Sequence, residues 1–124
     1  MTFKDEVKKV YYDYFDDTLA NISDTATKII DQLIKMFDLQ LISYPDYYNT
    51  IHFQNQNSNL IENRYVIILR IEAKTASRPN MYYTFSIADR SFSPSGKPST
   101  KEIFFTRATS FDNFYAKLSN FLEE

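Results

Sequence analysis

Few residues in this chain have the types and spacing that catalysis requires. His52 is the only histidine and there is no cysteine, so thiolate chemistry is excluded and a transition-metal site would have to rely on carboxylates. Gly96 is the only glycine and precedes Lys97. A Walker phosphate loop needs another glycine five residues earlier and a hydroxyl after the lysine, where Ser91 and Pro98 stand. His52 alternates with apolar neighbours, which predicts an exposed strand position.

One set of residues has the types and order of a metal-dependent site. Asp46 follows a proline, and Glu72 and Lys74 are separated by one residue, a pattern that resembles the PD-(D/E)xK nuclease motif. The resemblance implies that Asp46 and Glu72 hold Mg²⁺, that Lys74 orients or activates a water molecule, and that the protein cuts DNA. Hard oxygen ligands suit Mg²⁺. On a strand, Glu72 and Lys74 would share a face with Arg70. A Mg²⁺-dependent nuclease is therefore the enzymatic alternative.

The N-terminal third has the pattern of helices. Thr2 has the residue type of an N-cap, and apolar residues recur at helical spacing from Phe3 onward. A second apolar series continues to Met36, and the two series are offset by one residue near 16–17. Residues 3–38 are therefore predicted to form either one long helix with a stutter or two helices, the second capped by Ser23.

The rest of the chain predicts a sheet and a last helix. Runs rich in β-branched and aromatic residues, separated by turn residues, predict strands at 39–44, 49–53, 64–74, 81–88 and 101–106. A final helix is expected to start at Thr109 or Ser110. The predicted fold is an α+β two-layer sandwich with an N-terminal helix (one long or two), an antiparallel meander of four or five strands, and a C-terminal helix. Residues 1–124 are expected to form a single domain.

Hydropathy and charge indicate the expected cellular location of the protein and the distribution of its charge. The longest apolar run, residues 66–69, is too short to span a membrane, and the N-terminus lacks the apolar stretch of a signal peptide. A cytoplasmic protein is expected. Residues 1–40 hold five lysines and eight carboxylates, a balance of −3, whereas residues 62–107 hold eight basic and four acidic residues, a balance of +4. The sequence therefore predicts an acidic helical end and a basic sheet.

The stretch VYYDYFDD at residues 10–17 combines four aromatic rings with three carboxylates. On a continuous helix, Val10, Tyr11 and Tyr14 would fall on the core side with Phe3. Tyr12 and Asp16 would point to solvent with Asp13 beside them, so core packing does not account for them. We therefore predict Tyr12, Asp13 and Asp16 as partner-binding residues.

The basic sheet supplies a second set of candidates. An exposed face that carries Arg70 and Tyr82 would offer basic and aromatic groups, which can stack bases and hold phosphates. Arg90, Lys97 and Lys101 surround the loop between the last two strands and would favour anionic surfaces. These five residues are the remaining predicted partner-binding positions, and a nucleic-acid-binding module that uses this face is a further alternative.

The main expectation is a small non-enzymatic binding protein that acts through a macromolecular partner. Aromatic residues make up 17% of the chain, and tyrosine beside charge is common at interfaces. In size and composition the chain is similar in style to small phage or mobile-element proteins that inhibit a host protein, anti-CRISPR and anti-restriction proteins among them. The partner is expected to be a protein such as a nucleic-acid-binding enzyme, with nucleic acid or a homodimer as alternatives. No cofactor is expected, except Mg²⁺ in the nuclease alternative.

Overall fold

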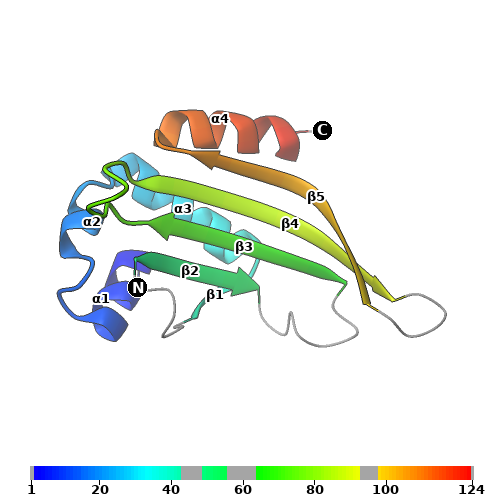
Figure 1. The fold of residues 1–124 in the computed structure, drawn as a ribbon, viewed down its shortest axis with the longest axis horizontal. Helices are drawn as coiled ribbons and strands as arrows, with labels where there is room; N and C mark the ends of the chain where they lie inside the picture. The colour runs from blue at the N-terminus through cyan, green and yellow to red at the C-terminus, as the bar shows by residue number, and fades with distance from the viewer. Residues whose placement is uncertain (1, 43–48, 56–63, 93–97, 124) are drawn as a thin grey trace.

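Residues 3–36 form three helices rather than one or two. The computed structural model describes residues 2–42, 49–55, 64–92 and 98–123. Its elements, in chain order (Figure 1), are α1 (Phe3–Tyr11), α2 (Asp16–Ala20), α3 (Asp24–Met36), β1 (Leu39–Ile42), β2 (Thr50–Asn55), β3 (Tyr65–Glu72), β4 (Tyr82–Phe92), β5 (Pro98–Ala108) and α4 (Phe111–Leu122). This order confirms the predicted α+β fold with an antiparallel sheet between terminal helices.

Local hydrogen bonds explain where the first helices begin. At α1, the Asp5 N–H donates to Thr2 Oγ1 over 3.3 Å, and the Thr2 N–H donates to Asp5 Oδ2 over 3.1 Å, which is a capping box. At α3, the Ala26 N–H donates to Ser23 Oγ over 3.1 Å. The predicted caps Thr2 and Ser23 are therefore confirmed, and the prediction of one long helix is wrong.

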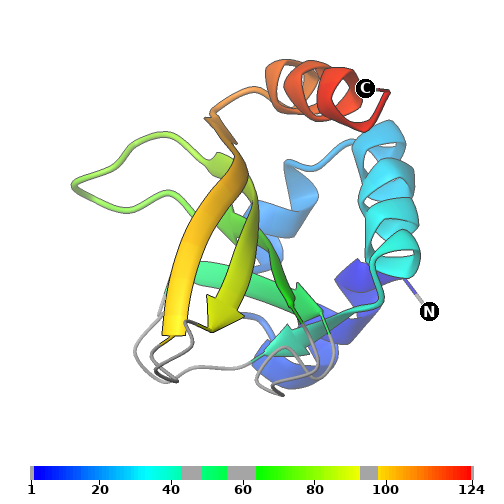
Figure 2. The ribbon, with the colours of Figure 1, turned by 90° about the vertical axis from the view of Figure 1, so that its right-hand side faces the viewer.

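The five strands form one antiparallel sheet in the order β1-β2-β3-β4-β5. Helices α1, α3 and α4 lie on one side of this curved sheet, as Figure 2 shows, while the segment between β3 and β4 projects away from them. β4 and β5 are the longest strands, and their register shifts between Ile87 and Ala88. A shift of this kind, a β-bulge, bends the strand locally.

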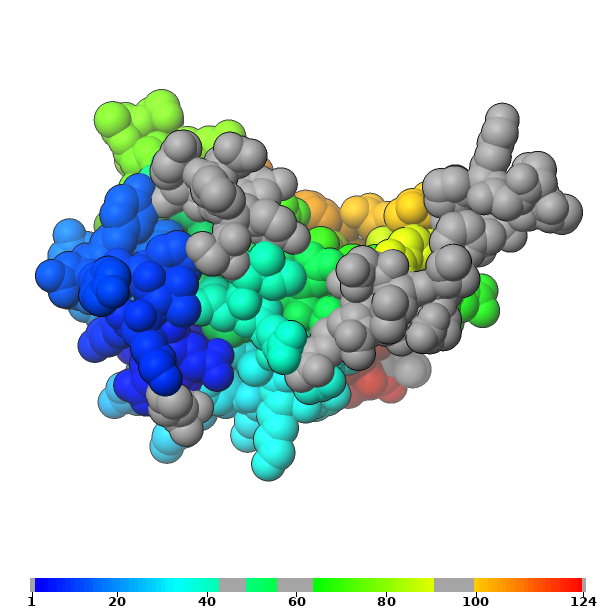
Figure 3. Space-filling model, turned by 90° about the horizontal axis from the view of Figure 1, so that it is seen from below, coloured from blue at the N-terminus to red at the C-terminus, as the bar shows by residue number. Residues whose placement is uncertain are grey.

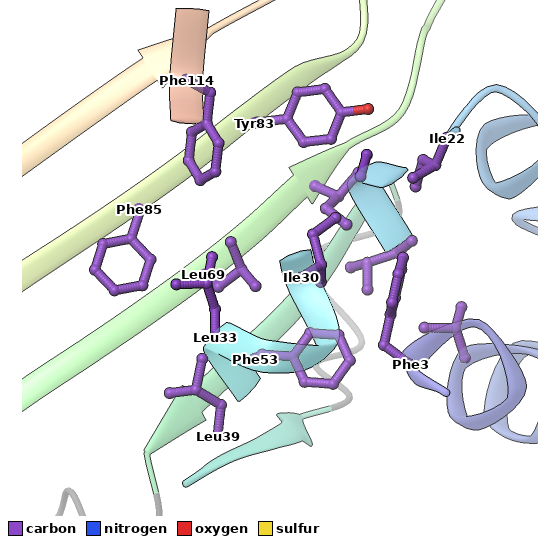
Figure 4. Close-up of a cluster of buried hydrophobic side chains, with 14 of the residues drawn as sticks. Phe3, Ile22, Ile30, Leu33, Leu39, Phe53, Leu69, Tyr83, Phe85 and Phe114 are labelled. Carbon is purple, nitrogen blue, oxygen red and sulfur yellow. The ribbon is translucent and has the colours of Figure 1, made fainter. Parts of the chain in front are cut away.

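The core lies between the helices and the sheet (Figure 4). Alternate residues of β2, β3 and β4 are buried on the helical side, because successive side chains of a strand point to opposite faces. Phe3 of α1 meets Phe53 of β2 edge to face, with ring centroids 6.4 Å apart. Phe114 of α4 packs near Tyr83, at 5.8 Å between centroids. Part of the high aromatic content of the sequence therefore lies in this core.

Three burial predictions are wrong. Val10 and Tyr14, expected in the core, are 46% and 60% exposed. For Tyr14 the reason is that α1 ends at Tyr11, so the helical frame that placed it in the core does not reach it. His52, expected at an exposed strand position, is only 6% exposed, and its Nε2 lies 3.1 Å from Gln54 Oε1. Within the described parts of the chain, no helix has the length and apolarity to cross a membrane.

Candidate functional site

The predicted residues Tyr12 and Asp13 lie on the connection between α1 and α2, and Asp16 is the first residue of α2. We call residues 10–17, which include the ends of both helices, the acidic turn. Tyr12 has φ 52° and ψ −119°, and the Tyr14 N–H donates to the carbonyl oxygen of Tyr11 over 3.1 Å. These values match the first central residue of a type II′ turn, a position dominated by residues such as glycine that tolerate positive φ. Tyr12 therefore occupies a conformation that disfavours its own side chain.

Aromatic contacts hold the acidic turn in place. The buried ring of Phe15 meets Tyr11 and Tyr14 edge to face, with centroids 5.0 Å and 4.9 Å away. The Tyr14 hydroxyl donates to Asn49 Oδ1 over 3.2 Å, which ties the turn to the residue before β2. The ring contacts of Phe15 and the hydrogen bond of Tyr14 thus fix the turn against the rest of the protein.

The acidic turn displays its other side chains to solvent. Tyr12 is 78% exposed, and Asp13 and Asp16 are exposed as well. In Figure 1 the connection between α1 and α2 forms an outer edge of the molecule. All three predicted residues are therefore accessible to solvent. The structure adds Val10 and Tyr14, which the helical pattern had assigned to the core.

A polar pocket of about 280 Å³ lies beside the acidic turn. Tyr14 and Asp17 line it from the helical end, and Lys74 and Met81 line it from the segment that joins β3 to β4. Figure 3, a view from below, shows the blue helical end next to that light-green segment. Sequence reasoning missed this pocket because its two walls lie more than 50 residues apart.

The residues of the nuclease-like motif are divided between different surroundings. Glu72 is the last residue of β3. Its Oε2 accepts hydrogen bonds from the Thr84 hydroxyl at 3.3 Å and from Arg107 Nε at 3.2 Å, and its Oε1 lies 3.7 Å from the guanidinium of Arg78. Lys74 follows the end of the strand and lines the polar pocket, so the expected shared strand face is not formed.

Asp46 lies outside the described residues, so its placement beside Glu72 stays a prediction. Among the residues that the structure describes, no group of three His, Cys, Asp or Glu side chains could hold a metal ion. The Glu72 carboxylate itself is engaged by two cations and a hydroxyl. It therefore does not fit the role of an open Mg²⁺ ligand.

The sheet face opposite the helices carries a row of polar residues. His52, Arg70, Thr84 and Arg107 are successive cross-strand partners on β2, β3, β4 and β5. Arg70 is half-buried, and its Nε is buried without a hydrogen-bond partner among the described residues. Burial lowers the pKa of His52, and the positive charge of Arg70 lowers it further, whereas the hydrogen bond that the His52 ring donates to Gln54 Oε1 raises it. At neutral pH, His52 is therefore uncharged, and the positive charge of the row comes from Arg70 and Arg107.

Tyr82 continues this face in the neighbouring row, where it pairs with Glu72. The guanidinium of Arg107 lies over the Tyr82 ring, 4.1 Å from its centroid, an arrangement that favours a cation–π contact. The predicted pair Arg70 and Tyr82 therefore lies close together. Arg107 was not predicted, because the strand expected at 101–106 stops one residue before it, whereas β5 extends to Ala108.

The other predicted basic residues lie elsewhere. Arg90 is half-buried near the end of β4, and its backbone N–H donates to the carbonyl oxygen of Arg64 over 2.7 Å. Lys101 is exposed on β5 opposite Asp89. Both are separated from the Thr84 row by about six residues along the strand, or roughly 20 Å. Lys97 lies outside the described residues.

Comparisons of the chain with protein-family models, with curated proteins and with solved structures found no match.

Proposed function

We propose that this chain is a small non-enzymatic binding protein that acts through a macromolecular partner, and that the acidic turn is its contact surface. The observation that carries the proposal is the conformation of Tyr12. A tyrosine with an almost fully exposed ring stands where the backbone favours glycine. Local strain of this kind persists where the surroundings impose it, and it clusters at functional sites.

The chemistry of the acidic turn suits an interface. Tyr12 is large and amphipathic and has few side-chain torsions, so ordering it on binding costs little entropy. The turn that presents Tyr12 is already fixed by the buried ring of Phe15, so less order has to be gained when a partner docks. The proposal therefore assigns Tyr12 as the central contact of the interface.

The charge of the acidic turn indicates the class of partner. Asp13, Asp16 and Asp17 are all exposed, and carboxylates at an interface favour a partner with a basic surface. A nucleic-acid-binding protein has such a surface. We accordingly propose a phage or mobile-element inhibitor that covers a basic site of a host protein, a role supported by the size and composition of the chain.

A paired substitution tests the proposal. Tyr12→Ala with Asp16→Ala removes one exposed ring and one carboxylate from the acidic turn. The matched control, Tyr115→Ala with Asp112→Ala, removes the same groups from exposed positions of α4. A host protein captured by the wild-type chain is purified, and its affinity for each variant is measured. Because a hot-spot tyrosine contributes about 2 kcal/mol or more, the first pair is expected to weaken binding at least about 30-fold.

The control pair is expected to bind like the wild type, and both pairs should melt within a few degrees of it. Unchanged affinity of the Tyr12 and Asp16 pair would show that the interface lies elsewhere. An equal loss in both pairs would show that overall charge, rather than the acidic turn, governs binding.

A further inference from the structure

A basic groove lies at the edge of the sheet where β5 leads into α4. It has a volume of about 550 Å³, and its walls include Tyr82, Arg107, Asn113 and Lys117. Among the described residues that line it, none is acidic. The groove is separate from the acidic turn, and the proposed function does not use it.

The charge around the groove is strongly positive. Arg70 lies two strands from Arg107 in the same cross-strand row, which corresponds to about 10 Å. Lys117 is exposed on α4. The carboxylate of Glu72 lies beside Arg107 and is shared by Arg107 and Arg78. Glu72 therefore does not neutralise the charge of Arg70, which remains available to an anionic ligand. The Nε of Arg70 is buried and has no hydrogen-bond partner among the described residues.

The groove also offers a flat surface for stacking. The Arg107 guanidinium rests on the Tyr82 ring at 4.1 Å from the centroid, so its opposite face can receive a planar group. Nucleic-acid bases stack on guanidinium planes and aromatic rings once they are released from a helix. On the sheet face, Phe105 adds an aromatic ring that is 48% exposed, one row away from Arg107.

We propose that this basic groove binds single-stranded nucleic acid. Arg70, Arg107 and Lys117 contact successive phosphates, and a base stacks on the Arg107–Tyr82 pair. Three separated cations suit a chain of phosphates better than a single anion, and charge combined with a stacking platform is the usual basis of non-specific single-strand binding. Duplex DNA satisfies only the charge, because its bases remain stacked within the helix.

The salt dependence of binding provides a quantitative test. A fluorescein-labelled oligothymidine of about 12 nucleotides is titrated with the full-length protein, and fluorescence anisotropy is recorded. Three phosphate contacts predict that log K falls with log salt at a slope of about −2 for a single strand. Between 50 and 200 mM salt, the affinity is then expected to fall about 20-fold.

Single substitutions locate the site. Lys117→Gln and Arg70→Gln are each expected to weaken binding and to reduce the slope by about 0.7. Tyr82→Leu is expected to weaken binding about tenfold with an unchanged slope, because it removes the ring that holds the Arg107 guanidinium in position for stacking and removes no charge. Lys28→Gln, an exposed lysine on α3, is the matched control and should leave both affinity and slope unchanged. Because Lys117 is exposed, its variant remains informative even if the half-buried Arg70 variant fails to fold.

Three results would overturn the proposal. The first is the absence of an anisotropy change at 50 mM salt with protein up to 100 µM. The second is an effect of Lys28→Gln as large as that of Lys117→Gln. The third is competition by duplex DNA or polyglutamate as effective as that by unlabelled oligothymidine, which would identify a general surface for polyanions. Because the oligonucleotide assay does not involve Tyr12, its outcome is independent of the proposed protein interface.

Discussion

Replacing Tyr12 with glycine is expected to stabilise the fold while it weakens partner binding. Tyr12 has φ 52°, and a β-carbon in this region approaches the neighbouring backbone too closely. Glycine has no β-carbon and adopts positive φ at no steric cost. The Tyr14 N–H bond to Tyr11 is made by the backbone, so the substitution leaves the turn itself intact.

The expected size of the effect follows from three contributions. Relief of the strained conformation is worth about 1–2 kcal/mol. The greater freedom of glycine in the unfolded chain removes about 0.4–1 kcal/mol of that gain. Loss of side-chain packing is small because the ring of Tyr12 is 78% exposed. The net stabilisation is then about 0.5–1 kcal/mol, which corresponds to a rise in Tm of about 2–5 °C for a chain of this size.

The assay compares the wild type, Tyr12→Gly and Tyr12→Ala by thermal and urea unfolding. The alanine variant removes the ring but keeps the β-carbon, so its stability should stay close to that of the wild type. The difference between the two variants isolates the backbone strain from the loss of the ring. If Tyr12→Gly melts at or below the temperature of Tyr12→Ala, then Tyr12 is not strained and the reasoning from its conformation is refuted.

Three further predictions concern the body of the protein. Asp31 of α3 accepts the Phe3 N–H over 2.8 Å at the start of α1, so Asp31→Ala is expected to lower the free energy of unfolding by about 1–2 kcal/mol in urea titrations. Burial lowers the pKa of His52, so the unfolded state takes up a proton first on acidification. Stability should therefore decline as the pH falls through about 6.5, the unfolded-state value, and His52→Gln should flatten that decline. Mg²⁺ is expected to leave the Tm unchanged and plasmid DNA uncut, because Glu72 is already held by two arginines; cleavage that disappears in Lys74→Ala would contradict this.

Local signals in the sequence were sufficient for much of the fold. The caps at Thr2 and Ser23 depend on side chains within three residues of the helix start, so they can be identified without tertiary contacts. The strands could be recognised from alternation and from the turn residues that bound them. Their lengths were less accurate: β5 spans Pro98–Ala108 rather than 101–106, because pairing with β4 extends both strands beyond their apolar segments.

The break after α1 could not be predicted in the same way. No glycine or proline marks Tyr12, and the helical spacing of apolar residues continues past it. The turn buries Phe15 and exposes Tyr14, whereas a continuous helix in register with Phe3 and Val7 would place Tyr14 at the centre of the apolar stripe and Phe15 at its edge. Tertiary packing thus overrides a periodic pattern, and the uninterrupted pattern placed Tyr14 in the predicted core.

The candidate surfaces were predictable only in part. The exposure of Tyr12 could be predicted because its spacing from the apolar residues places it outside the apolar stripe. The contact between Glu72 and Arg107 joins residues that are 35 positions apart, so it depends on the register of three strands. The basic groove additionally requires α4 to be placed beside β5. Each of these features depends on pairing distant segments, which single-sequence periodicity does not specify.

The most direct test of the proposed interface is site-specific photo-crosslinking in host cells. A photoreactive phenylalanine analogue is placed at position 12, and in a matched control at position 115 on the exposed side of α4. We expect a discrete covalent adduct with one host protein from position 12, lost when Asp16→Ala is added, and no such adduct from position 115. An adduct from position 115 alone, or equal adducts from both positions, would contradict the assignment of the acidic turn as the binding surface.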